Sequence, residues 1–288
     1  MSFEEHRSLL FTISYELLGS VADAEDVVQE TYLRWSSRPV DVEVVNPRAY
    51  LAQIATRLSL NRLRTLARRR EDYVGPWLPE PLLTVPDVAD DVVLAESVSL
   101  ALLVVLESLG PKERAVFLLR EVFGYEHTEI AAALDMTAAA VRQTAHRARA
   151  HVEARRPRFA VDDELMGEVG QRFTAALSGG DVQALMDLLA PDVVVLSDGG
   201  GVVRSARRPV HGADGAARLL VGIVGKAGPG LRVEPALING RPGWRAWDGD
   251  RLIGCLQLMI SDDRITQVLI MINPEKLAGL GEPRPIAR

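Results

Sequence analysis

Apolar residues recur at helical spacing along the first 70 residues of the chain. Between residues 9 and 18 they fall on one helical face, which ends at Gly19. A second helix is predicted over 23–36, because Asp23 is an N-cap type of residue followed by two acids in the first turn. Asn46-Pro47 is typical of a third helix start, and this helix can run to about Arg70. The pattern predicts an all-helical domain over residues 1–70.

Four prolines interrupt this pattern between residues 71 and 91. Proline at this density blocks helix and favours extended chain, so the segment is predicted to be a linker. Helical spacing returns over 92–156, with helices expected at 92–109, 111–122, 127–134 and 138–154. The last two are separated by the short break Asp135-Met136-Thr137 and have the lengths of a helix-turn-helix.

After residue 156 the pattern becomes mixed. Helices are expected at 163–178, 181–189 and 215–226, and strands at 193–196, 231–238, 243–247, 252–260 and 265–272. Such a mixture predicts an α+β domain over 163–277 with a tail at 278–288. The expected fold is therefore two all-α domains followed by one α+β domain.

Acidic and basic residues are unevenly distributed along the chain, so the net charge alone is a poor guide to its partners. The 288 residues carry a net charge of −6, which by itself disfavours a nucleic-acid partner. Residues 71–106, however, hold seven acids and no base, whereas residues 47–70 hold seven arginines and no acid. Residues 137–158 add six arginines against one acid. Such clustering indicates nucleic acid more strongly than the net charge opposes it. The acidic linker, with Glu80, Asp87, Asp90 and Asp91, is hypothesised to mimic a nucleic-acid strand.

The chain is expected to work in the cytoplasm. Its single cysteine, Cys255, excludes an internal disulfide. No apolar run reaches the ~20 residues that a membrane span needs, and the first residues do not resemble a signal peptide. No membrane partner is expected.

Two helices carry donors suited to DNA. The segment 138–154 has a buried stripe on one face and long donors elsewhere, as a recognition helix requires. These donors are Arg142, Gln143, His146, Arg147 and Arg149. A polar stripe on 47–70 comprises Arg57, Asn61, Arg64 and Arg68. Either helix alone is also compatible with a solvated surface.

The order of motifs resembles the bacterial extracytoplasmic-function (ECF) sigma factors. Residues 19–34 are similar to region two of that family, 46–70 to the segment that opens and reads the −10 element, and 109–152 to region four, which reads the −35 element. The resemblance implies binding to core RNA polymerase and promoter DNA. It assigns Arg57, Asn61, Arg64 and Arg68 to the −10 region and the donors of 138–154 to the −35 region. The implied polymerase-binding residues are Asp26, Gln29, Glu30 and Arg34. Many relatives have an acid where Asn61 stands, so the −10 preference is not carried over.

Three further motifs resemble the ECF41 group, which has a fused C-terminal SnoaL-like domain of the NTF2-like cone fold. This resemblance implies that the domain regulates the sigma factor and that a separate anti-sigma factor is not required. The implied regulatory residues are Trp77, Leu78, Pro79, Glu80 and Pro81 in the linker, Asp198, Gly199, Gly200 and Gly201, and Asn273, Pro274, Glu275, Lys276 and Leu277. Relatives usually have lysine where Val202 stands.

Catalysis is the less favoured interpretation of the C-terminal domain. SnoaL-like enzymes use a carboxylate or histidine, and the candidates are Asp198, His211, Asp248 and Asp250. Spacing pairs none of them, so no catalytic, cofactor or metal site is expected. Trp244 and Trp247 should face opposite sides of their strand. A small-molecule ligand in the cone remains open, as do two other functions: a one-component helix-turn-helix regulator, and an enzyme fused to a DNA-binding module.

Overall fold

The computed structural model describes residues 3–39, 44–85, 92–155, 163–228 and 230–288. It contains two compact units, neither of which is continuous in sequence. The helical unit contains Met1–Asp72, Thr84–Arg156 and Pro283–Arg288, and the cone unit contains Tyr73–Leu83 and Pro157–Glu282. Among the helices so described, none is long and apolar enough to cross a membrane.

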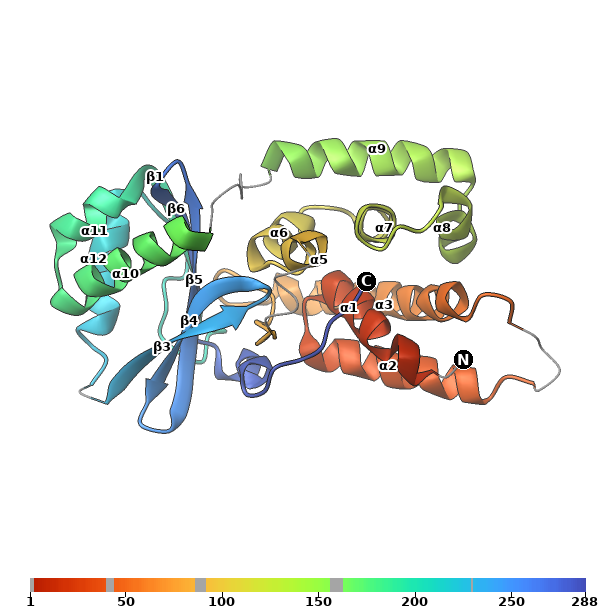
Figure 1. Ribbon diagram of the computed structural model, residues 1–288, viewed down its shortest axis with the longest axis horizontal. Coiled ribbons are helices and arrows are strands. Elements are labelled where there is room, and N and C mark those ends of the chain that lie inside the picture. The colour runs from red at the N-terminus through yellow and green to blue at the C-terminus, as the bar shows by residue number, and fades with distance from the viewer. Residues whose placement is uncertain (1–2, 40–43, 86–91, 156–162, 229) are drawn as a thin grey trace. The chain divides into compact units, whose positions relative to one another are not determined.

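The first half of the helical unit consists of η1 (Glu4–His6), α1 (Arg7–Leu18), α2 (Val21–Ser36) and α3 (Pro47–Glu71) (Figure 1). α1 is buried from Leu9 through Leu18 and ends at Gly19, whose φ of 66° suits glycine. α2 begins earlier than predicted. Ser20 is its N-cap, and the Ser20 hydroxyl accepts a hydrogen bond from the amide of Asp23 at 3.3 Å. Asp23 instead lies in the first turn, where the helix dipole favours an acid.

The second half consists of α5 (Val92–Ser97), α6 (Leu100–Leu106), α7 (Pro111–Phe117), the π-helical turn η2 (Leu118–Val122), α8 (His127–Leu134) and α9 (Ala138–Arg155). Two helices replace the single one predicted over 92–109. The chain leaves helical conformation at Ser99, whose hydroxyl caps α6 by accepting from the amide of Leu102. α8 ends at Asp135 in the left-handed region, and the Thr137 hydroxyl caps α9 by accepting from the amide of Ala140 at 3.1 Å. The predicted helix-turn-helix break is confirmed.

The cone unit has helices on one face of a six-stranded sheet. Its helices are α10 (Asp163–Gly179), α11 (Val182–Leu188) and α12 (Ala213–Val224). Its strands are β1 (Leu189–Asp198), β2 (Val210–His211), β3 (Leu231–Ile238), β4 (Arg241–Asp248), β5 (Arg251–Ser261) and β6 (Arg264–Met271). Two short turns follow, η3 (Pro274–Lys276) and η4 (Ala278–Leu280).

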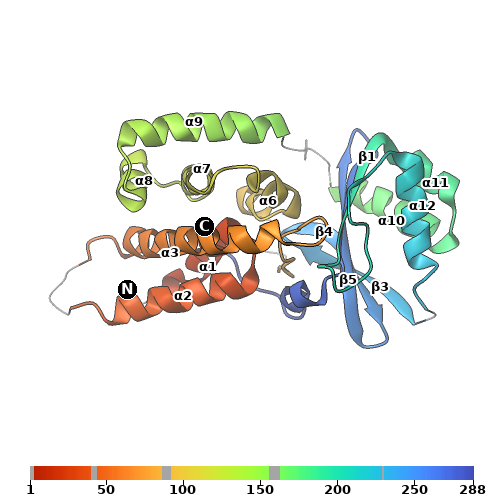
Figure 2. The same ribbon diagram turned by 180° about the vertical axis from the view of Figure 1, so that it is seen from behind.

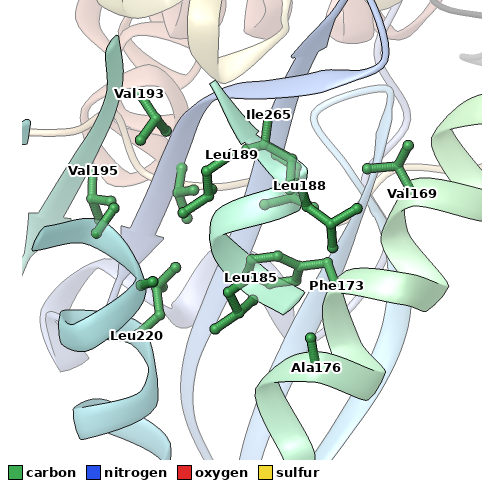
Figure 3. Close-up of a cluster of buried hydrophobic side chains, with 14 of the residues drawn as sticks. Val169, Phe173, Ala176, Leu185, Leu188, Leu189, Val193, Val195, Leu220 and Ile265 are labelled. Carbon is green, nitrogen blue, oxygen red and sulfur yellow. The ribbon is translucent and has the colours of Figure 1, made fainter. Parts of the chain in front are cut away.

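The strand order is β2-β1-β6-β5-β4-β3, and only β1 and β6 pair in parallel among the described strands. This parallel pair places Asp198, the last residue of β1, opposite Met271, the last residue of β6. The core lies between sheet and helices, where Phe173 and Val169 of α10 meet Leu185, Leu220 and the strands (Figure 3). Figure 2 shows α10, α11 and α12 beside the sheet from the opposite side. The α+β prediction is confirmed, and β1 is longer than the predicted strand at both ends.

The last six residues of the chain belong to the helical unit. Arg284 donates to Glu25 at 2.5 Å, and its guanidinium lies 5.5 Å from the centroid of the Phe11 ring. The amide of Ala287 donates to the Thr12 hydroxyl at 3.1 Å, and Ile286 between them is buried. This segment therefore completes the packing around α1.

A carboxyl group is buried in the helical unit. Glu16 of α1 has no exposed surface, and its Oε1 accepts from the Ser97 hydroxyl at 2.7 Å. Its Oε2 has no hydrogen-bond partner among the described residues. Burial raises the pKa of Glu16 from 4.5 to about 8, although the Ser97 hydrogen bond and the charge of Arg114 oppose the shift. Glu16 is consequently protonated in the folded protein at neutral pH.

We expect Glu16→Gln to remove a pH dependence of stability. Between pH 4.5 and 8 the folded protein keeps a proton that the unfolded chain releases, so the free energy of unfolding falls as pH rises. The slope is on the order of 1 kcal/mol per pH unit. Glutamine resembles the protonated acid, so the variant should match wild type near pH 4.5 and exceed its stability by about 3 kcal/mol near pH 7.

Urea unfolding of both proteins at several pH values measures this difference. Glu153→Gln, at an exposed position of α9, is the matched control. A wild-type and Glu16→Gln difference that stays constant from pH 4.5 to 8 contradicts the prediction.

Candidate functional site

The recognition helix α9 presents its predicted donors to solvent. Val141, Ala145, Ala148 and Val152 form the buried stripe, as predicted. All five donors, Arg142, Gln143, His146, Arg147 and Arg149, are exposed. α8 and the caps around Asp135 and Thr137 fix this orientation, so α9 has the arrangement that major-groove reading requires.

The five donors of α9 divide into two groups. Arg149 donates to both carboxylate oxygens of Glu121 at 2.7 and 2.6 Å, and Arg147 lies 3.8 Å from Glu113. Arg142, Gln143 and His146 make no hydrogen bond or ion pair with any described residue. The group without partners comes first along α9, near the N-terminal end that reads base edges in helix-turn-helix proteins.

The polar stripe of α3 is engaged within the helical unit. Arg57 donates to the carbonyls of Ala133 and Ala132 at 2.8 and 2.9 Å and to Asp135 at 3.0 Å. These carbonyls lie at the C-terminal end of α8, where a cation also complements the helix dipole. Gln53, one turn earlier, donates to the carbonyl of Ala132 at 2.9 Å. α3 thus holds α8 in place.

The remaining stripe residues differ in their surroundings. Asn61 and Arg64 are exposed, and Arg64 donates to Asn61 Oδ1 at 3.2 Å. The side chain of Arg68 lies outside the described residues. The sequence pattern treated the stripe as one surface, but the structure assigns Arg57 to helix packing and leaves Asn61 and Arg64 accessible.

α2 carries the residues assigned to the polymerase. Asp26, Gln29, Glu30 and Arg34 are exposed along it. Arg62 of α3 bridges Asp23 and Asp26 at 2.5 and 2.6 Å, and Arg34 donates to Glu30 at 2.8 Å. Tyr32 and Leu33 on the same helix are 47% and 57% exposed, large values for such side chains. Sequence reasoning missed the exposure of Tyr32 and Leu33, because the helical spacing of apolar residues does not distinguish a buried residue from one that faces a partner.

The linker residues Tyr73–Leu83 pack within the cone unit. Asp198, at the end of β1, is fully buried and accepts four hydrogen bonds. The donors are the Tyr73 hydroxyl at 2.6 Å, the Leu78 amide at 2.8 Å, the Gly200 amide at 3.0 Å and Lys276 Nζ at 2.8 Å. We call these residues, with Asn273, the linker-docking site.

Lys276 supplies the counter-charge in this site. Its Nζ donates to the Leu78 carbonyl at 2.8 Å as well as to Asp198. The same ammonium lies 4.5 Å from the centroid of the Tyr73 ring and 4.3 Å from that of the Trp77 ring, within the range of cation–π attraction. Both backbone groups of Leu78 are therefore satisfied by side chains of the cone, which allows this residue to be buried.

Asn273 and the three glycines complete the site. The Asn273 side chain donates to the Tyr73 hydroxyl at 2.9 Å and accepts from the amide of Glu275. Gly200 has a φ of 62°, and a Cβ there would lie 2.3 Å from Asn273 Nδ2, so only glycine fits. Burial raises the pKa of Tyr73, and the hydrogen bond to the Asp198 carboxylate raises it further, whereas the hydrogen bond from Asn273 opposes the rise. The tyrosine consequently remains a donor.

The rest of the linker continues along the cone. Pro79 and Pro81 are buried and have no amide hydrogen that would need a partner. The amide of Leu82 donates to Asn239 Oδ1 at 2.8 Å, and the Asn239 amide donates back to the Leu82 carbonyl at 2.8 Å. The motifs named Trp77 to Pro81 but missed Tyr73 and Asn239, whose roles depend on contacts 125 and 157 residues apart. Val202, at the position where relatives have lysine, is 64% exposed.

The acidic residues around the linker have separate locations. Glu80 is half-buried, whereas Asp87, Asp90 and Asp91 lie outside the described residues. The hypothesis that this acidity mimics a nucleic-acid strand therefore stays a prediction.

The acid/base candidates of the cone do not converge. Asp198 serves the linker-docking site, and His211 is exposed on β2. Asp248 pairs with Arg251 at 3.5 Å at the β4–β5 turn, where Asp250 also lies. None of the four lines the cavity between α10, α12 and the sheet. Among the described residues of the cone, these four side chains form no pair for acid/base chemistry.

Comparison with known proteins identifies the family to which these helices and the cone unit belong. Residues 2–69 match the model of Sigma-70 region 2, and residues 99–152 match that of Sigma-70, region 4. The helical unit is therefore that of a sigma-70 type transcription factor. The chain is 39% identical to the ECF RNA polymerase sigma factor SigJ of Mycobacterium tuberculosis, over 96% of this chain and 92% of the relative. It belongs to the ECF RNA polymerase sigma factors.

Two further matches agree. The probable ECF RNA polymerase sigma factor SigI of Mycobacterium tuberculosis is 32% identical, over 96% of this chain and 93% of the relative. The crystal structure of SigJ matches with a TM-score of 0.77 at 37% identity and covers 96% of this chain and 97% of its own. The similarity thus includes the cone unit as well as the two sigma regions.

We expect Asp198 and Lys276 to be strongly coupled in stability. Asp198→Asn leaves the Lys276 ammonium buried without its counter-charge, which typically costs 3–5 kcal/mol, about 4 kcal/mol here. Lys276→Met likewise leaves the Asp198 carboxylate buried without its counter-charge. The double variant should lose much less than the sum of the two single losses.

Urea unfolding of the four proteins gives the coupling energy. The matched control is the cycle of Asp248→Asn and Arg251→Met, because that pair is exposed, and its coupling should stay below about 1 kcal/mol. Additive losses in the Asp198–Lys276 cycle contradict the interpretation.

Proposed function

We propose that this protein binds core RNA polymerase and directs it to promoters, using α2 for the polymerase and α3 and α9 for DNA. The observation that carries the proposal is the exposed, unpartnered group Arg142, Gln143 and His146 on a capped recognition helix, in a chain related to ECF sigma factors along 96% of its length. No nucleotide chemistry is required of the chain, because the polymerase supplies it.

The chemistry of α9 supports reading of the −35 element. Arginine binds guanine O6 and N7 with two hydrogen bonds, and glutamine can bind adenine in the same way. Arg147 and Arg149 already have acidic neighbours, which suits them to orient the helix and to meet phosphates at its edge. Sequence discrimination is therefore assigned to Arg142, Gln143 and His146.

The exposed apolar residues of α2 support the polymerase assignment. Tyr32 and Leu33 lie among Gln29, Glu30 and Arg34, and exposed apolar side chains within a polar rim are typical of protein interfaces. Burial of these two side chains against the polymerase would release the water that they now order. Their polar neighbours would fix the orientation of the contact.

The engagement of Arg57 supports a regulated −10 interaction. Its donors now face α8, whereas Asn61 and Arg64 are exposed and bonded only to each other among the described residues. A role of Arg57 at the −10 element therefore requires α8 to leave α3. Contact with promoter and polymerase would have to compensate for the lost hydrogen bonds of Arg57. The state in which α8 packs on α3 is therefore proposed to be the resting state.

The linker-docking site supports regulation by the cone. The linker joins the two sigma regions. When Tyr73–Leu83 is docked on the cone, fewer linker residues remain to span the distance between the two regions. The proposed regulation therefore acts in cis, without a separate anti-sigma factor, a cofactor or catalysis. A factor that meets core polymerase in this way works in the cytoplasm.

We expect Arg142→Ala to reduce promoter-specific transcription by about tenfold, because loss of one good base contact costs roughly 1–3 kcal/mol. The measurement is in vitro transcription with core RNA polymerase on a panel of genomic promoters. Arg172→Ala removes an exposed arginine of α10 and serves as control. If the wild-type protein yields no promoter-dependent transcript but binds a palindromic duplex without polymerase, the chain is a one-component regulator instead.

Undocking the linker should change promoter activity by at least threefold. Lys276→Met in the full-length chain weakens the docking of Tyr73–Leu83, which protease cleavage within that segment reports. Arg251→Met is the control for loss of a cation. A full-length variant is preferable to truncation near residue 160, because truncation also removes the Arg284 contacts of the helical unit. Increased cleavage with unchanged transcription contradicts regulation through this site.

A further inference from the structure

A cavity lies in the cone unit between α10, α12 and the concave part of the sheet. Its volume is about 130 Å³. The walls include Phe173 and Leu177 of α10, Leu220 of α12, and Trp244, Leu256 and Ile270 of the strands. Side chains alternate along β4, as predicted for Trp244 and Trp247. Trp244 and Ala246 face the cavity, whereas Trp247 packs with the guanidinium of Arg245 on the other face.

The described wall is almost entirely carbon. Its side chains with a polar atom are Thr174, Cys255 and Trp244, and none of them carries a charge. The Thr174 hydroxyl already donates to backbone carbonyls of its own helix, with Gly170 and Gln171 at 3.0 Å. Burial raises the pKa of Cys255 to about 12, so the thiol is uncharged. A ligand with a carboxylate or an ammonium group would lose its hydration here without gaining a counter-charge from the described wall.

One wall is aromatic and rigidly held. The Trp244 ring lies against α10 at Gly170, where a Cβ would come within 2.7 Å of the ring. The Trp244 and Phe173 ring centroids are 6.4 Å apart with the planes tilted by 38°. Rings in this arrangement offer both a face and an edge to a third ring. The shape of the wall therefore favours a flat aromatic molecule over a branched aliphatic one.

The cavity has an apolar entrance. Ile223 of α12 and Val233 of β3 contribute to its lining, yet they are 37% and 48% exposed. Apolar side chains that are exposed at the mouth of a pocket mark a binding site more often than an isolated surface residue does. A neutral molecule can therefore enter without crossing a charged rim.

We propose that this cavity binds a small, uncharged aromatic molecule of about one ring. An apolar cavity of about 150 Å³ stays dry and binds benzene, so a cavity of this size and composition has room for such a ligand. The proposal concerns a ligand site and does not depend on the promoter function of the helical unit.

Binding of benzene, toluene and indole to the full-length protein tests the proposal. The readout is methyl NMR of the wall residues Ile253, Ile270 and Ile272, with Ile13 and Ile130 of the helical unit as internal references. We expect saturable shifts confined to the wall methyl groups. Benzoate has the size of toluene but carries a charge, and it should bind at least tenfold more weakly.

A cavity-filling variant supplies the matched comparison. Ala246→Phe places a ring in the space that the ligand would take and should weaken toluene binding at least tenfold. Ala175→Phe makes the same substitution at an exposed position of α10 outside the wall and should leave binding unchanged. If Ala246→Phe does not fold, Ala227→Leu, at another small wall residue, decides the question by the same criterion.

Three results would overturn the proposal. The first is the absence of saturable wall shifts at the solubility limit of benzene and toluene. The second is equal toluene affinity in wild type and in a folded cavity-filling variant. The third is binding of benzoate as tight as that of toluene, since it would mean that a polar site elsewhere holds the ring.

Discussion

The Asp198 carboxylate is the interaction on which the cone unit depends most. A fully buried carboxylate is tolerated only when its oxygens are satisfied and its charge is compensated. Asp198 meets both conditions with groups from three other parts of the chain: Tyr73 and Leu78 of the linker, Gly200, and Lys276. The end of a strand, a glycine turn, a linker and a terminal turn are thereby held at one point. The linker is thus an integral part of the cone's hydrogen bonding.

The sequence was sufficient to predict most of the elements. The helix-turn-helix, the Thr137 cap and the strand β3 follow from local patterns, and the structure has them at or near the predicted residues. The errors are also local in origin. Ser20 and Ser99 both act as N-caps. At the first position Asp23 is the more obvious N-cap candidate, and at the second apolar periodicity continues across the cap. Periodicity reports burial, whereas a cap depends on one side chain and one amide.

The functional surfaces were less predictable, because their residues obtain roles from distant partners. Arg57 and Arg64 have the same residue type and lie on one predicted stripe, but only Arg57 meets the carbonyls at the end of α8. Similarly, the linker motif gave no indication of Tyr73 or Asn239, since each acts through a contact more than 120 residues away. The clustered arginines lie on α3 and α9. The acidic total of the chain reflects mainly the stretch between them.

The position of the last six residues has a consequence for the synthesis of the protein. Arg284 and Ala287 contact Glu25 and Thr12, which precede them in the chain by 259 and 275 residues. The helical unit therefore lacks part of its packing until residues 284–287 have been translated and have left the exit tunnel. By then the cone sequence has also been made, including every residue that holds the linker. The order of synthesis thus ensures that a completely packed sigma module does not precede its own regulatory domain.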